Sequence, residues 1–244
     1  MLYKILLLIG SSALVFYCLT AVSLQQNHPE NNAPKITITS PTNNSQFYWN
    51  SMVPYSIRIA DVEDGNSEYN EIASNEVLIM IRYLRDSNLV KKYLLDRSKT
   101  TPEPLVWMRN STCFSCHSAQ AKLIGPSYNL IAKKYPNNST SVETLAKKII
   151  EGNSGTWGDT QMPPHPDLTI ERTRQIVRWI LKNGADSDQN YFVGVEGAFH
   201  TKGKPENEAK KGVYVLTASY IDHGLKNVPG SSKQGQHSIV LKNF

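Results

Sequence analysis

The hydrophobic pattern of this chain changes its period twice, and this change constrains the fold more than any other feature. Over residues 35–83, apolar residues alternate with polar ones, which predicts short antiparallel strands. From about 101 to 183 the apolar residues recur at helical spacing instead. Alternation returns at 213–217 and in a last short run at 238–241. We therefore predict a multidomain chain in which an all-α domain lies between two β segments.

In the first β segment, residues 34–98, the alternating run Val53–Ile59 is followed by the turn Asp61-Val62-Glu63-Asp64-Gly65. On these residues the segment resembles the immunoglobulin-like or polycystic-kidney-disease-type β modules of exported bacterial proteins. Asp61, Glu63 and Asp64 carry the oxygen ligands that Ca²⁺ prefers. We favour the simpler interpretation, a solvated turn closed by Gly65.

The second β segment, residues 187–244, contains too much polar loop to bury a core by itself. Its strands over 212–224 and 238–241 resemble the last two strands of an immunoglobulin-like module. We therefore hypothesise that this β extension completes a single sandwich begun at 34–98, with the helical domain inserted between the halves. The alternative is that each β segment packs separately against the helical domain.

The N-terminus has the charge layout of an export signal. Lys4 is followed by residues 5–24, which contain no charged residue, and Ala21-Val22-Ser23 offers a cleavage site. We predict a signal peptide over 1–23, a polar linker over 24–33, and a protein located in the periplasm, where nucleic acid is not a partner. The alternative is an uncleaved membrane anchor through residues 5–24.

The chain has three cysteines in 244 residues, which excludes a disulfide-dense scaffold. Two of them belong to the pentapeptide Cys113-Phe114-Ser115-Cys116-His117. This CxxCH pattern is the attachment signature of c-type haem: the two thiols can bond to the two vinyl groups, and His117 can bind the iron. A thioredoxin-like site would need strands around the pair, and a zinc site would need two more ligands, so we disfavour both.

A second iron ligand is predicted in a loop rich in glycine and proline. Met162 lies in Trp157-Gly158-Asp159-Thr160-Gln161-Met162-Pro163-Pro164-His165-Pro166. A thioether is a suitable distal ligand for low-spin haem. A methionine that only fills a core usually lies in a periodic element, as Met108 does, whereas Met162 lies between two helical patterns. His165 is the nearby rival.

Residues 101–186 resemble the small bacterial class I cytochromes c. The resemblance rests on Cys113–His117, on Lys122–Tyr128, on Ile131–Tyr135, and on Trp157-Gly158 before Met162–Pro166. It implies the all-α cytochrome c fold, one covalent haem c, His117 and Met162 as axial ligands, and electron transfer rather than enzyme activity. It also implies that the Pro126 carbonyl accepts a hydrogen bond from His117 and that Trp157 lies near a haem propionate.

Other functions remain open at the level of sequence. A haem enzyme or gas sensor would need a displaceable distal ligand, and the β module could be a binding device. The order of the modules resembles the tail of bacterial quinoprotein sugar dehydrogenases, which implies a periplasmic dehydrogenase or another redox protein as partner. Five lysines of the helical domain could steer an acidic partner, although an ordinary solvated face explains them equally well. They are Lys122, Lys133, Lys134, Lys147 and Lys148.

Overall fold

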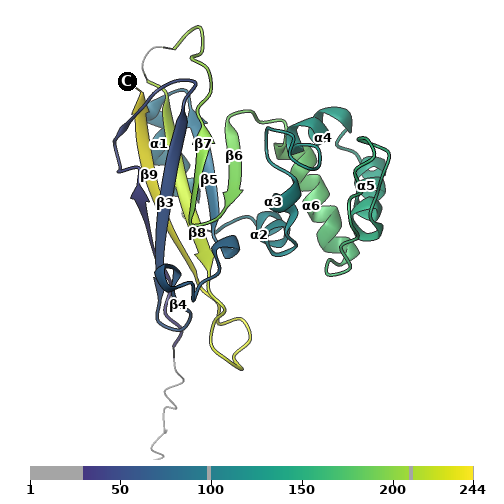
Figure 1. Ribbon diagram of the computed structural model, residues 1–244, viewed down its shortest axis with the longest axis horizontal. Coiled ribbons are helices and arrows are strands. Elements are labelled where there is room, and N and C mark those ends of the chain that lie inside the picture. Colours follow the sequence, from purple (N-terminus) through teal and green to yellow (C-terminus); the bar gives the residue numbers. More distant parts are fainter. Residues whose placement is uncertain (1–29, 98–99, 209–210, 244) are drawn as a thin grey trace, which may run out of the picture. The chain divides into compact units, whose positions relative to one another are not determined.

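The computed structural model describes residues 30–97, 100–208 and 211–243 of the 244 residues (Figure 1). The predicted signal peptide over 1–23 and most of the polar linker over 24–33 lie outside the described residues. Among the described residues, no helix is both long and apolar enough to cross a membrane.

Along the chain, strands occur both before and after a helical region. The strands are β1 (Lys35–Ser40), β2 (Gln46–Phe47), β3 (Met52–Asp61), β4 (Gly65–Asn66), β5 (Leu78–Leu84), β6 (Gln189–Val193), β7 (Glu196–His200), β8 (Val213–Ile221) and β9 (Gln234–Asn243). The α-helices are α1 (Val90–Arg97), α2 (Glu103–Asn110), α3 (Cys113–Cys116), α4 (Tyr128–Lys134), α5 (Ser139–Glu151) and α6 (Ile170–Asn183). Three short 3₁₀ helices complete the order: η1 (Ser67–Tyr69), η2 (Ser74–Glu76) and η3 (Ser87–Leu89).

The strands form two sheets, and each sheet uses strands from both β segments (Figure 1). One sheet has the order β1-β3-β4, with β7 also paired to β3; the other has the order β2-β9-β8-β5-β6. β5 pairs antiparallel with β8 at Leu78↔Ser219 and with β6 at Arg82↔Gln189. The segments before and after the helical region therefore pair directly with each other, and the helical region is an insertion between β5 and β6.

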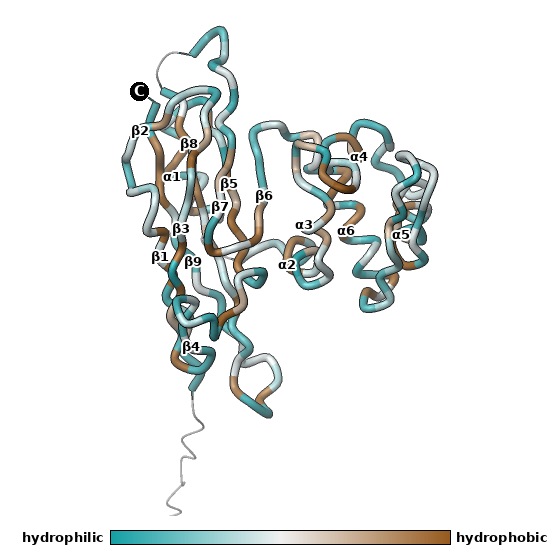
Figure 2. The backbone as a smooth tube through the Cα atoms, in the orientation of Figure 1, coloured by the Kyte–Doolittle hydropathy of each residue, from teal (hydrophilic) through white to brown (hydrophobic). Residues whose placement is uncertain are grey.

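The main apolar core lies between these sheets. In β3, Tyr55, Ile57 and Ile59 are buried while Arg58 between them is exposed, as alternation predicts for a strand with one solvated face. β8 is buried at every position from Val213 to Tyr220. Its neighbour β5 is likewise a hydrophobic run (Figure 2). Continuous burial of this kind indicates that both faces of the sheet are covered.

Different elements cover the outer face of this sheet at different points. α1 packs Val90 and Leu94 against Val213 and Val215 of β8. The remaining outer face, on β5 and β6, packs against the helical region. Neither α1 nor β6 and β7 was predicted, because these short elements carry no clear periodicity.

Five helices, α2 to α6, form the helical region. A side chain caps the N-terminus of α4, α5 and α6: Ser127 accepts from the N–H of Leu130, Asn138 from that of Ser141, and Thr169 from that of Arg172. Helices predicted near 127–135, 141–151 and 169–183 correspond to α4, α5 and α6. α5 and α6 pack together around Val142, Ala146, Val177 and Leu181.

The helical region and the sheets share one hydrophobic cluster. Leu78, Met80 and Tyr191 of β5 and β6 pack in the same cluster as Leu105 and Met108 of α2. Polar contacts flank it: the Gln120 Nε2 donates to the Asp186 carbonyl at 2.8 Å and to the Gln189 carbonyl at 2.9 Å. The insertion is therefore packed onto the sheet and not merely tethered to it.

Candidate functional site

The Cys113–Cys116 pair lies on α3, a single helical turn. Positions separated by three residues share one face of a helix, so this turn brings the two thiols together. His117 ends the turn, and its N–H donates to the Cys113 carbonyl at 3.0 Å. Burial raises the pKa of the Cys113 thiol to about 12. A thiol held protonated in this way is unlike the activated thiolate of a disulfide oxidoreductase.

The imidazole of His117 is held by its Nδ1 atom, which lies 2.6 Å from the Pro126 carbonyl oxygen. A carbonyl only accepts, so Nδ1 carries the proton and the lone pair of Nε2 is left for a metal. Burial lowers the pKa of His117, which favours the neutral ring that a metal requires. Tyr128 stacks on the imidazole with ring centroids 5.8 Å apart.

Gly125 leaves the space that the His117 ring occupies. A Cβ atom built at Gly125 would lie 2.4 Å from the His117 Cε1, closer than real Cβ contacts allow. The Gly125 N–H donates to the Cys116 carbonyl at 2.9 Å and fixes this approach. Sequence reasoning did not identify Gly125 as a site residue; its position directly before Pro126 was the available signal.

Met162 is fixed through its backbone to the segment that follows α5. Its N–H donates to the Asn153 carbonyl at 2.8 Å, and its carbonyl accepts from the Asn153 N–H at 3.1 Å. Gly152 precedes this bridge with a φ of +79°, and a Cβ there would lie 2.8 Å from the Met162 carbonyl oxygen. The His165 N–H donates to the Ile149 carbonyl at 3.1 Å. The loop that carries Met162 is thus held at two points against the end of α5.

All six predicted site residues line one pocket of the helical domain: Cys113, Cys116, His117, Pro126, Trp157 and Met162. Apolar side chains of α2, α4, α5 and α6 supply much of the remaining wall, among them Met108, Ile131, Leu145, Ile149, Val177 and Ile180. His165, the rival ligand, lines the same pocket.

The mostly apolar wall of this pocket fits an apolar cofactor that brings its own metal. Within residues 30–97, 100–208 and 211–243, no group of three His, Cys, Asp or Glu side chains is placed to hold a metal ion. A nitrogen from His117 and a sulfur from Met162 would leave the other coordination positions of an iron to the cofactor. The Tyr128 hydroxyl is buried in the pocket wall without a hydrogen-bond partner. A buried polar group without a protein partner is expected where a cofactor binds.

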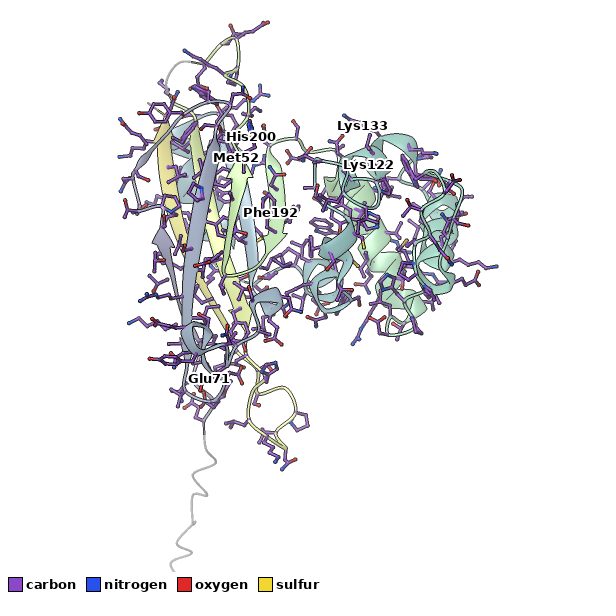
Figure 3. All side chains as sticks on the ribbon, viewed as in Figure 1. Met52, Glu71, Lys122, Lys133, Phe192 and His200 are labelled. Atoms are coloured by element: carbon purple, nitrogen blue, oxygen red, sulfur yellow. The ribbon has the colours of Figure 1, made fainter. Side chains whose placement is uncertain are left out.

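The lysines of the helical domain have different roles in the structure. The Lys134 Nζ lies 4.4 Å from the ring centroid of Trp157, and the Lys148 Nζ donates to the Thr156 Oγ1 at 2.9 Å. These two lysines therefore hold the loop that contains Trp157. Lys122 and Lys133, labelled in Figure 3, are exposed.

Known proteins that are similar to this chain match it over the helical domain. The sequence model of the family described as cytochrome c matches residues 107–184. Cytochrome c-552 of Hydrogenobacter thermophilus is 44% identical over 69 residues, which are 28% of this chain and 69% of the relative. Cytochrome c-551 of Allochromatium vinosum is 35% identical and covers 32% of this chain and 82% of its own length. Cytochrome c-551 of Pseudomonas aeruginosa is 30% identical, with shares of 36% and 84%.

Proposed function

The chain belongs to the cytochrome c family through its helical domain, and we propose that it is an exported electron carrier with His117 and Met162 as axial ligands. Its cofactor is one covalently bound haem c, attached in this proposal through Cys113 and Cys116. The observation that carries the proposal is the single pocket that both thiols, the imidazole and the thioether line. When bound, the haem supplies an iron that alternates between Fe(III) and Fe(II).

The surrounding residues would keep both axial side chains in place. The Pro126 carbonyl holds the proton on the Nδ1 of His117, which makes Nε2 a better electron donor to a metal. The backbone bridge between Asn153 and Met162 opposes movement of the thioether. Small structural change between the two redox states favours fast electron transfer, and a displaceable ligand would be needed for a haem enzyme or a gas sensor. The backbone bridge between Asn153 and Met162 therefore supports an electron carrier rather than a haem enzyme or a gas sensor.

Cytochrome c domains act with redox partners, and we propose a periplasmic dehydrogenase as the partner of this chain. The combination of a β module and a cytochrome c domain in one chain supports this assignment. The exposed side chains of Lys122 and Lys133 offer positive charge on the helical domain, with Lys122 at the pocket itself. An acidic partner surface would be attracted to this charge, and the association rate would fall as salt is added.

Replacing Met162 by Ala tests the proposed ligation. We expect the reduction potential to fall and the reduced protein to bind CO at neutral pH, because the thioether that stabilises Fe(II) is removed. Redox titration and optical spectra measure both effects. Met52, which is 60% exposed on β3 and labelled in Figure 3, provides the matched control Met52→Ala. An unchanged potential in Met162→Ala would reject Met162 as ligand.

Mass spectrometry of the intact exported protein tests the rest of the proposal. The measured mass would report whether the haem is attached and whether residues 1–23 have been removed.

A further inference from the structure

Three buried polar side chains lie near one another at the end of the sheets that carries β4 and the β8–β9 loop (Figure 1): Asn31 is hydrogen-bonded to Asp222, and Asp222 is close enough to Asp61 to raise its pKa. Asn31 precedes β1, Asp61 ends β3, and Asp222 follows β8. Their exposed fractions are 3%, 8% and 3%. Two carboxylates buried to this degree need partners for nearly all of their oxygen atoms.

Most of these oxygen atoms have partners within the protein. The Asp61 Oδ1 accepts from the N–H of Glu63 at 3.0 Å and from that of Asp64 at 2.8 Å. The Asp222 Oδ1 accepts from the N–H of Gly224 at 2.9 Å and from that of Lys233 at 2.8 Å.

The amide of Asn31 joins this arrangement from a distant part of the chain. Its Nδ2 donates to the Asp222 Oδ2 and to the Ser231 carbonyl, both at 2.9 Å. The same bonds leave its Oδ1 without a donor.

Two buried oxygen atoms of this cluster have no hydrogen-bond partner: the Asn31 Oδ1 and the Asp61 Oδ2. Each destabilises the folded state if it remains desolvated and unpaired. Burial raises the pKa of Asp61, and the nearby charges of Asp64 and Asp222 raise it further, although backbone donors oppose this. The negative charge of the cluster is therefore not fully balanced, and two of its oxygen atoms lack a hydrogen-bond donor.

The other acidic side chains of the turn are already engaged. The Asp64 Oδ2 accepts from the Tyr220 hydroxyl at 2.6 Å and from the N–H of His223 at 2.9 Å. The exposed Glu63 carboxylate accepts from the side chain of Asn32 at 2.9 Å. The set Asp61, Glu63 and Asp64 considered from the sequence is thus not the set that the fold brings together.

We propose that Asn31, Asp61 and Asp222 bind one Ca²⁺ ion through the Asn31 Oδ1, the Asp61 Oδ2 and the Asp222 Oδ2. Ca²⁺ accepts carboxylate and amide oxygens in irregular geometry, and water or backbone carbonyls complete its six to eight ligands. Two carboxylates and one amide make a site of modest charge, which is typical of the weaker Ca²⁺ modules with Kd on the order of 10⁻⁴–10⁻³ M. The ion would join three segments that are distant in sequence and would fix the start of the β region to both sheets.

The test is thermal unfolding of the full-length holoprotein, followed by far-UV circular dichroism in excess EGTA, in about 10 mM CaCl₂ and in about 10 mM MgCl₂. We expect Ca²⁺ to raise the Tm by about 5 °C or more and Mg²⁺ to have little effect. Asp61→Asn keeps the turn acceptor Oδ1 and removes the charge, so it should abolish the Ca²⁺ effect. In EGTA this variant should be as stable as the wild type or more stable. Glu68→Gln, which removes an exposed carboxylate of η1, is the matched control and should keep the full effect.

A second variant tests the site by a gain of affinity. Asn31→Asp adds a third carboxylate, so we expect the Kd for Ca²⁺ in calorimetry to fall about tenfold and the Tm in EGTA to fall. A wild-type Tm and calorimetric signal that do not respond to Ca²⁺ would overturn the proposal, as would a Ca²⁺ effect that Asp61→Asn leaves unchanged. These readouts do not involve the haem, so they stand apart from the proposed electron transfer.

Discussion

Gly125 and Gly152 position the two proposed iron ligands through the side chains that they lack. At Gly125 the missing Cβ leaves room for the His117 ring, and at Gly152 it leaves room for the carbonyl of Met162. The Pro126 carbonyl adds a directed contact, because it accepts a hydrogen bond from the His117 Nδ1. At the scale of single residues, the site therefore depends as much on excluded volume as on donor atoms.

Gly125→Ala tests this steric requirement. The added methyl group must displace the His117 ring, so we expect a loss of about 1–3 kcal/mol in the free energy of unfolding and a perturbed optical spectrum. Equilibrium denaturation of the holoprotein measures the first effect. Gly203→Ala is the control, because a Cβ at Gly203 meets no heavy atom within 4 Å. Equal stability of the two variants would show that the ring has room to move.

The sequence identifies some of these residues and hides others for a physical reason. Cys113, Cys116 and His117 lie within five residues, so the sequence alone predicts their chemistry. Met162 is distant, but its loop of glycine and proline marks it as unlike a core methionine. The role of Gly125 depends on a contact through space with His117, and its position directly before Pro126 is the signal that the sequence carries for it.

Among the elements, β8 shows where a periodic pattern has to be interpreted with its surroundings. Val213, Val215 and Thr217 alternate with Tyr214 and Leu216 in the sequence, yet all of them are buried. Tyr214 and Leu216 face the core between the sheets, and Val213 and Val215 meet α1 on the outer face. The strand itself was predicted from the sequence, but α1 was not, because this short helix carries no clear periodicity.

The connection from β7 to β8 carries a carboxylate that supports the sheet. The Glu208 Oε2 accepts from the Tyr83 hydroxyl at 2.7 Å, and its Oε1 accepts from the N–H of Lys211 at 3.0 Å and from that of Gly212 at 2.9 Å. Burial raises the pKa of Glu208, but these hydrogen bonds outweigh burial and leave the pKa below its usual value. The stability from this group is therefore present above pH about 4.5 and is lost as the pH falls through the lower pKa of the folded state.

Glu208→Gln should remove that pH-dependent contribution. We expect the variant to be less stable than the wild type at pH 7, and the gap between them to narrow as the pH is lowered from about 5 to 3. Urea unfolding at several pH values measures this gap. Glu206→Gln, at an exposed position of the same loop, is the control. A constant gap across the pH range would contradict the assignment.

For the whole molecule, the shared cluster between the sheets and the inserted domain couples the stability of the two. Met80 is 2% exposed and packs in the cluster that contains Leu105 and Met108, and Met108 also lines the cofactor pocket. A substitution at Met80 on β5 therefore alters the packing of a cluster that includes a residue of the pocket wall.

Met80→Ala should destabilise both parts together. We expect a loss of about 2–5 kcal/mol from the cavity, with equal shifts of the unfolding midpoint measured by far-UV circular dichroism and by haem absorbance. Met52→Ala, on an exposed part of β3, is the control. A shift in the sheet signal alone would show that the inserted domain unfolds independently.

The joining of the two β segments could be inferred from sequence, but not its form. Residues 187–244 are too polar to bury a core alone, which favours a shared sandwich. The structure pairs β5 with β8 from Leu78↔Ser219 to Leu84↔Val213, and β3 with β7. Alternation determines which face of a strand is apolar, whereas neighbours and register depend on side-chain packing between strands that are distant in sequence.

The parallel pairing of β2 with β9 gives the molecule a high contact order. Phe47 pairs with Asn243, near opposite ends of the chain. Because the chain is synthesised from its N-terminus, β5 cannot pair with β6 and β8 until the inserted domain has been synthesised. The attachment motif at 113–117 therefore becomes available for cofactor insertion before either sheet can close. During that interval the apolar run of β5 is a site for misfolding, because pairing between segments that are distant in sequence is slow.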